Sequence, residues 1–165
     1  MVGARGPGAH EAEWYNHQPA RQIKEKVSKE TWDDYLKVCN IRNPWEIFVS
    51  YFHFRNPAAK TLGPETFIPM FREWAMQDNG KWGQPNYFVD GRSVADVHIR
   101  YEHLAQDFQA LCDRIGAVMP ELPFTKNEHR GKKVDYRAYF DAPTQAHVAD
   151  LRAQEIDYFG WTFDG

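Results

Sequence analysis

An arginine and a serine eight residues apart are the side chains of this sequence best suited to bind an anion. Arg42 follows the apolar segment 36–41, which predicts a short buried strand, and Ser50 lies about two turns into a helix that Pro44 can begin. A guanidinium binds a phosphate through two parallel hydrogen bonds, and the first helical turn adds free amides. The pattern therefore predicts a phosphate site. The alternative is structural: Arg42 pairs with a carboxylate, and Ser50 bonds to its own helix.

Two other side chains could take part in proton transfer. His17 precedes a helix predicted to run from Pro19 to about Val27. A neutral imidazole accepts protons near neutral pH, so His17 is our candidate general base, and the alternative is that it caps this helix. Glu102 lies at the end of a predicted strand, just before a helix, which favours a structural hydrogen bond over catalysis.

Composition and charge exclude several classes of protein. With 20 basic and 23 acidic residues the net charge is -3, so no global positive field attracts nucleic acid or anionic membranes. No apolar run approaches the roughly 20 residues of a membrane span, and no signal peptide is apparent. Cys39 and Cys112 lie in apolar surroundings and predict reduced thiols in the cytoplasm. We expect no metal site, because no shared ligand spacing joins His53, His98, His103, His129 and His147.

Helices and extended segments alternate along the chain. After a loose segment 1–15, we expect one domain over 16–165. Its order predicts an α/β fold with a mostly parallel sheet, which collects ligands at the carboxyl ends of its strands. Besides the elements above, we predict helices over 29–34 with Ser28 as cap, 65–76, 103–115 ending at Gly116, and Pro143–Tyr158, and extended chain at 87–89 and 94–101.

The segment around Arg42 resembles the 3′-phosphate-binding segment of sulfotransferases that use 3′-phosphoadenosine 5′-phosphosulfate. That family likewise has Arg-Asn-Pro-Trp with a serine eight positions after the arginine, as in residues 42–50 here. Other blocks resemble family segments in the family's order, and the carbohydrate-type branch is the most similar. These blocks are residues 16–20, 99–108, 136–140 and 155–163.

The resemblance implies a three-layer α/β/α fold like that of P-loop NTPases, and sulfuryl transfer from the phosphosulfate nucleotide to an acceptor hydroxyl, in the first place on a carbohydrate. It implies that Arg42 and Ser50 bind the 3′-phosphate and that His17 is the base. A basic loop with Arg130, Gly131 and Lys132 is then expected to close over the nucleotide. The alternative is that this loop is only solvated.

One part of the family pattern is not found in this sequence. Family members bind the 5′-phosphosulfate with a loop after their first strand, whereas Gly3, Gly6 and Gly8 lack a preceding strand and a following Lys-Thr or Lys-Ser. We therefore expect an N-terminally truncated form of the fold. Losing one such contact costs about 10² to 10³ in rate. A non-catalytic nucleotide-binding or interaction module, and a phosphate-binding domain of unrelated activity, remain alternatives.

Overall fold

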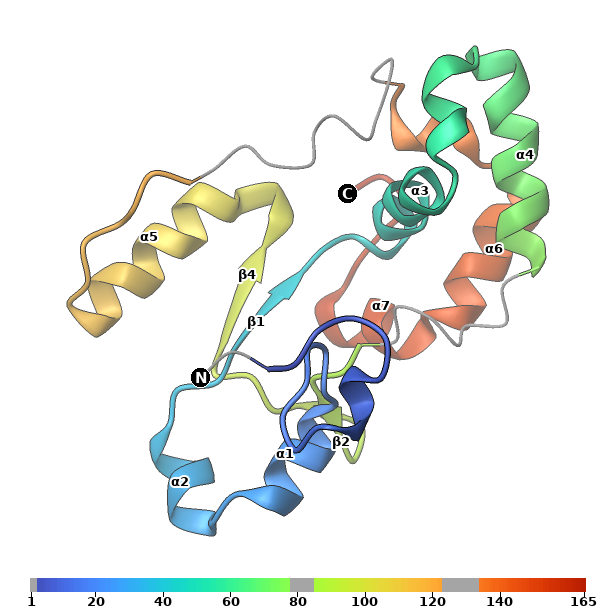
Figure 1. Cartoon of the computed structure of the whole chain (residues 1–165). Helices are drawn as coiled ribbons and strands as arrows, with labels where there is room; N and C mark the ends of the chain where they lie inside the picture. Colours follow the sequence, from blue (N-terminus) through green and yellow to red (C-terminus); the bar gives the residue numbers. More distant parts are fainter. Residues whose placement is uncertain (1–2, 78–84, 123–133) are drawn as a thin grey trace. The chain divides into compact units, whose positions relative to one another are not determined.

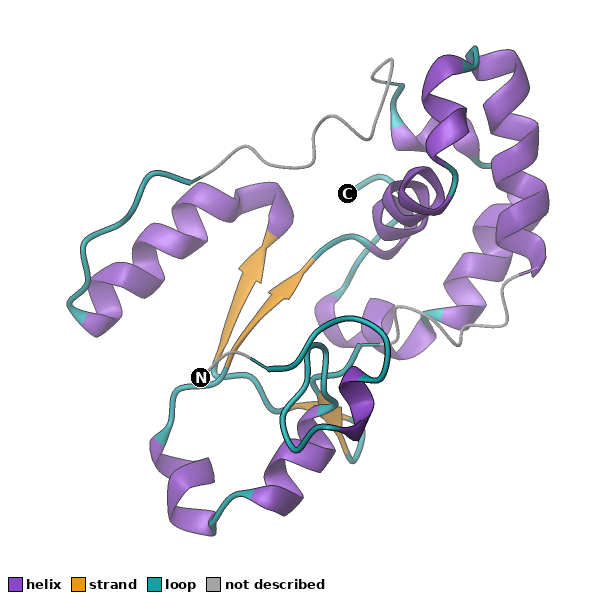
Figure 2. Cartoon of the chain, in the orientation of Figure 1, coloured by secondary structure: helices purple, strands orange, loops and turns teal. Residues whose placement is uncertain are grey.

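The computed structural model describes residues 3–77, 85–122 and 134–165 (Figure 1). The chain forms two compact units, Met1–Asn40 with Gln84–Ile99, and Ile41–Gly83 with Arg100–Gly165. Helices predominate, and the described part contains two short two-stranded sheets (Figure 2). The predicted mixed α/β character is confirmed. The three-layer arrangement and the single domain over 16–165 stay predictions.

The first unit contains two short helices and a β-hairpin. Pro19 is the N-cap of α1 (Ala20–Lys26), which therefore begins one residue after the predicted start. The Ser28 side chain accepts the Thr31 amide at the start of α2 (Lys29–Asp34), as predicted. Strands β2 (Phe88–Val89) and β3 (Arg92–Ser93) pair antiparallel. Asp90 and Gly91 join them with φ angles of 51° and 80°, as a tight two-residue hairpin turn requires. Near the N-terminus a short 3-10 helix, η1, covers Ala9–Glu11.

Strands β1 (Val38–Ile41) and β4 (Val97–Arg100) run in the same direction as a parallel pair (Figure 1). The prediction that the first of these strands is buried was wrong: Val38 is 41% exposed and Asn40 is also exposed, whereas Ile41 is buried. A parallel strand is buried when neighbours and helices cover both of its faces. In the described sheet β4 is the one strand paired with β1, which leaves Val38 accessible.

An aromatic core holds the second unit together. Helices α3 (Pro44–Arg55), α4 (Pro64–Gln77) and α6 (Ala142–Leu151) contact one another, and the short 3-10 helices η2 (Pro57–Thr61) and η5 (Tyr136–Tyr139) pack beside them. Their buried side chains include Phe48, Phe52, Phe71 and Tyr139. His53 is buried with them, its Nε2 lying 2.8 Å from the Tyr139 hydroxyl oxygen. Aromatic rings therefore supply most of this core.

The last predicted helix, Pro143–Tyr158, is divided in two. Helix α6 ends at Leu151, and α7 runs over Ala153–Phe159. Between them Arg152 adopts φ -117° and ψ 15° and is buried with its guanidinium 5.6 Å from the Phe48 ring centroid. Residues near this break must satisfy both helix geometry and this core contact. The sequence pattern predicts the helix but not the contact, so it did not indicate the break.

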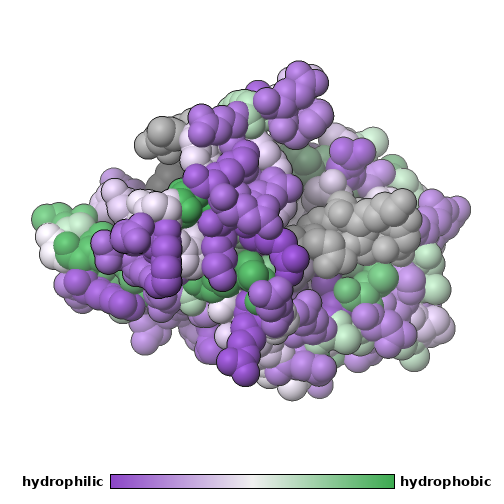
Figure 3. All heavy atoms as spheres, turned by 90° about the horizontal axis from the view of Figure 1, so that it is seen from below, coloured by the Kyte–Doolittle hydropathy of each residue, from purple (hydrophilic) through white to green (hydrophobic). Residues whose placement is uncertain are grey.

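Before α5 (Leu104–Ile115), the short 3-10 helix η3 covers Tyr101–His103. Gly116 ends α5 in the left-handed conformation, with φ 68°, as predicted. None of the helices in the described ranges is long and apolar enough to cross a bilayer. On the face drawn in Figure 3, hydrophobic residues form small separate patches among hydrophilic ones.

Asp141 caps α6, and its removal should destabilise the protein by about 1 kcal/mol. Its Oδ1 accepts hydrogen bonds from the Thr144 amide at 3.0 Å and hydroxyl at 2.6 Å. These bonds lower the pKa of Asp141 below its ordinary value of 3.8. The cap should therefore stabilise the fold fully above pH 3.8 and lose this effect as the pH falls through the folded-state pKa.

Urea unfolding of Asp141→Ala at pH 7 and at the acid limit of folding would measure both effects. Asp150→Ala is the control, because Asp150 is exposed near the other end of α6. Equal destabilisation by both substitutions would contradict a capping role.

Candidate functional site

Arg42 lies at the junction between β1 and α3, where its guanidinium is held by two neighbours. Its Nε donates to Glu46 Oε2 at 2.9 Å, and its Cζ lies 4.0 Å from the Tyr101 ring centroid. The side chain is 18% exposed. Neither Nη group forms a hydrogen bond with a residue that the structure describes. The guanidinium is thus oriented, and its outer edge is available to a ligand.

The first turn of α3 offers an anion fewer amides than the sequence suggested. Asn43 is the N-cap, and its Oδ1 accepts the Trp45 amide at 3.0 Å. Pro44 has no amide hydrogen. Two of the first-turn positions are therefore unable to donate to a ligand, and Arg42 is the main positive group at this turn.

Glu102 has the structural role that its position predicted. Its Oε1 accepts the Asn43 amide at 2.9 Å, which ties the start of α3 to the segment after β4. A carboxylate placed in this way orients the helix start next to Arg42.

Ser50 is exposed on α3, roughly 10 Å along the helix axis from the Asn43 cap. Its hydroxyl forms no hydrogen bond with the described residues, so the alternative bond to its own helix is not made. The hydroxyl is free to donate to a ligand. Its binding role stays a prediction.

His17 is exposed in the first unit and has an unusual backbone. Its φ is 60°, in the left-handed region that residues other than glycine seldom adopt and that is often found at functional sites. Among the described residues no side chain caps α1, so the alternative role of His17 as a helix cap is not observed. His17 instead lines a cavity of about 620 Å³. Its role as a base stays a prediction.

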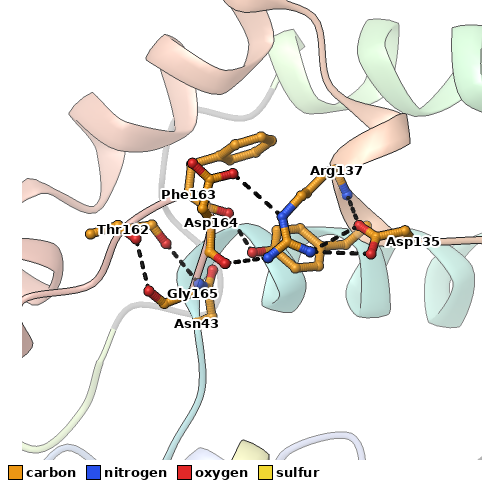
Figure 4. Close-up of polar contacts among 8 residues, drawn as sticks. Asn43, Asp135, Arg137, Thr162, Phe163, Asp164 and Gly165 are labelled. Carbon is orange, nitrogen blue, oxygen red and sulfur yellow. Dashed lines mark hydrogen bonds and ion pairs between the residues drawn. The ribbon is translucent and has the colours of Figure 1, made fainter.

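A second cavity, of about 530 Å³, lies in the second unit. Asn43, Glu102 and Arg137 are among the residues that line it. Figure 4 shows how the C-terminal segment reaches Asn43, whose Nδ2 donates to the Thr162 carbonyl at 3.0 Å. The Tyr136 hydroxyl also donates to the Phe163 carbonyl. This segment therefore supports the N-cap of α3.

Arg137 is neutralised by carboxylates in this network. Its Nη1 donates to Asp135 Oδ2 at 3.1 Å, and its Nε is 3.5 Å from Asp164 Oδ1 (Figure 4). Burial raises the pKa of the adjacent Tyr136, so its hydroxyl stays protonated and keeps donating. We therefore regard Arg137 as a structural residue. Residues 136–140 and 155–163 were both noted in the sequence as family-like blocks, but the sequence did not indicate that the two blocks contact each other.

The predicted site residues are distributed over the chain. His17 belongs to the first unit, Arg42 and Ser50 to the second, and Arg130, Gly131 and Lys132 lie outside the described residues. Within the described ranges no group of three or more His, Cys, Asp or Glu side chains could hold a metal ion. Sequence reasoning missed Gln18, Arg152 and Glu155, which are polar or charged and yet buried.

Comparison of the chain with protein-family models, with curated proteins and with solved structures found no match. The chemistry of the site is therefore inferred from its own residues.

Proposed function

We propose that this protein is a sulfotransferase. It would transfer a sulfuryl group from 3′-phosphoadenosine 5′-phosphosulfate to an acceptor hydroxyl, and a carbohydrate is the acceptor that we expect. The observation that carries the proposal is the segment from Arg42 to Ser50, in which an oriented guanidinium precedes α3 and an exposed hydroxyl lies midway along it. The same segment resembles the 3′-phosphate-binding segment of sulfotransferases. The proposal includes the three-layer fold of that family.

In this proposal Arg42 and Ser50 hold the 3′-phosphate of the donor. The Nη groups of Arg42, which form no hydrogen bond with the described residues, suit two phosphate oxygens, and the Ser50 hydroxyl suits a third. Arg130, Gly131 and Lys132, which lie outside the described residues, are proposed to bind the nucleotide as well. Cys39 and Cys112 do not form a disulfide with each other, which favours a cytoplasmic enzyme.

His17 would act on the acceptor. Its imidazole would take the proton of the acceptor hydroxyl while the oxygen bonds to sulfur, and the sulfur–oxygen bond to the donor's 5′-phosphate breaks. The products are a sulfate ester and 3′-phosphoadenosine 5′-phosphate. The left-handed backbone of His17 supports a functional role, because such a conformation is costly for a residue with a side chain.

A non-catalytic nucleotide-binding module derived from the same fold is the second candidate. The observation that favours it is the ion pair between Arg42 and Glu46, with Nε and Oε2 2.9 Å apart. A carboxylate beside the guanidinium repels a phosphate and weakens donor binding. Such a chain would bind nucleotide more weakly and transfer nothing.

Calorimetric titration with 3′-phosphoadenosine 5′-phosphate and with ATP tests the proposal. We expect a Kd on the order of micromolar for the first and at least about tenfold weaker binding of ATP, which lacks the 3′-phosphate. Equal affinities would indicate a phosphate-binding domain of unrelated activity, and no binding would refute both candidates. Mass spectrometry of an oligosaccharide incubated with protein and phosphosulfate donor then separates enzyme from module.

A further inference from the structure

The cavity beside His17 is rich in side-chain amides. Asn16, Gln18, Asn40 and Asn86 all line it. Its volume of about 620 Å³ lies within the range of roughly 300–1,000 Å³ typical of small-molecule sites. Each amide carries both a donor and an acceptor, so this lining can match a ligand with many hydroxyl groups.

Gln18 is the strongest indication that a ligand belongs in this cavity. The residue is 6% exposed, and its Oε1 accepts the Tyr15 amide at 3.3 Å. Its Nε2 is buried and has no hydrogen-bond partner among the described residues. A buried donor without a partner is unfavourable, and a ligand oxygen would satisfy it.

Flat aromatic rings complete the lining. Trp14, Tyr15 and Tyr87 line the same cavity. Aromatic rings combine a broad apolar surface with a polar edge, which suits the apolar face and the hydroxyl rim of a sugar ring. Amides and aromatic rings together therefore favour a ligand that is apolar on its faces and hydroxylated at its edges.

The lining of the cavity favours a sugar without charged groups. Among the described residues that line the cavity, His17 is the one imidazole, and none is Asp, Glu, Lys or Arg. An adjoining cavity of about 280 Å³ includes Lys37, but the Lys37 Nζ lies 2.9 Å from Asp96 Oδ2 and donates to the Trp32 and Tyr35 carbonyls. Lys26 Nζ lies 5.6 Å from the Trp14 ring centroid and donates to the Glu13 carbonyl. A ligand carboxylate would lose part of its hydration here and gain no charged partner among the lining residues, which is unfavourable.

We propose that this cavity binds an uncharged sugar and discriminates against acidic sugars. Only the role of that sugar as acceptor rests on the sulfotransferase function proposed above. In that case His17, which lines the cavity, would take the proton from one of the hydroxyls of the bound sugar. Sugar binding itself does not require sulfuryl transfer.

Indole signals in ¹⁵N-resolved NMR spectra of the full chain would report binding. Cellobiose should shift the Trp14 signal, identified by its loss in Trp14→Phe, with a Kd in the millimolar range. The Trp45 signal should not move, because that indole donates to the Gln145 carbonyl in the second unit. Cellobiouronic acid, the same disaccharide with one carboxylate, should bind at least about tenfold more weakly.

Two variants test the lining. Gln18→Met removes the buried donor and should weaken cellobiose binding about tenfold, whereas Gln154→Met, exposed on α7, should change nothing. If Gln18→Met does not fold, Asn40→Ala, on the exposed part of β1, should still weaken binding about threefold. Unchanged binding in a folded variant of either position would contradict the proposal.

Other outcomes also overturn it. The proposal of a neutral-sugar site would be wrong if the acidic sugar bound as tightly as cellobiose. It would also be wrong if neither sugar shifted the Trp14 signal. A Trp14 shift caused by adenosine and not by cellobiose would indicate a nucleobase site instead. Cellobiose binding without any nucleotide binding would refute the sulfotransferase and leave the sugar site, and the reverse result would refute only the sugar site.

Discussion

Replacing Arg42 with alanine should weaken the binding of 3′-phosphoadenosine 5′-phosphate at least about 100-fold. Each hydrogen bond between charged groups contributes about 1.5–3 kcal/mol, and a 100-fold change in Kd corresponds to about 2.8 kcal/mol. The two Nη groups of Arg42 are unbonded among the described residues and are already oriented by Glu46 and Tyr101. Little side-chain entropy is therefore lost on binding. Calorimetric titration of wild type and variant measures the effect.

Arg55→Ala is the matched control. Arg55 is the last residue of α3 and is exposed, so its replacement removes the same charge from the opposite end of the helix that follows Arg42. Its nucleotide affinity should stay within about twofold of wild type at physiological ionic strength, because exposed charges farther apart than about 8 Å are screened. An unchanged Kd in Arg42→Ala would place the phosphate site elsewhere.

A substitution at Glu46 tests the same phosphate site, and we expect it to change nucleotide affinity in the opposite direction. Glu46→Gln removes the negative charge from the side chain that now pairs with Arg42 Nε at 2.9 Å. Nucleotide affinity should then rise a few-fold, since a competing carboxylate no longer neutralises the guanidinium. Weaker binding in Glu46→Gln would mean that Glu46 mainly orients Arg42, as a positioning residue.

Phe71→Ala should lower the free energy of unfolding by about 3–5 kcal/mol. Phe71 is fully buried, and its ring packs against Phe52, Tyr139 and Phe140 with centroid distances of 5.6, 5.3 and 4.9 Å. The substitution removes these contacts and leaves a cavity between α4, α3 and the segment of η5 and Phe140. Urea unfolding followed by tryptophan fluorescence measures the loss.

Met70→Ala on the same helix is the control for Phe71→Ala. Met70 is 39% exposed, so its truncation should cost less than about 1 kcal/mol. If Phe71→Ala is unfolded in water, Phe71→Leu, which keeps most of the volume, should fold with an intermediate stability. A cost for Phe71→Ala no larger than that of Met70→Ala would contradict the core described above.

Local rules explain what could be predicted from the sequence. Ser28, Pro44 and Gly116 mark helix boundaries because capping, a fixed φ and a left-handed C-cap depend on a few neighbouring residues. These features are independent of the rest of the fold.

The environment of the candidate site depended on contacts between distant residues. The sequence indicated Arg42 as an anion-binding residue, but not that Glu46 and Tyr101 hold its guanidinium. The C-terminal segment fixes the α3 N-cap through a bond from Asn43 to Thr162, 119 residues away. No pattern in either segment specifies this pairing.

What the sequence determined by itself was the order of helices and strands and the residue types available for chemistry, because backbone sterics and hydrophobic periodicity act over a few residues. The tertiary structure alone decided burial: it left Val38 exposed, broke the last helix at a buried Arg152, and enclosed Gln18 Nε2, which has no hydrogen-bond partner among the described residues. Burial depends on which distant segments meet, and that is set by the packing of the whole unit.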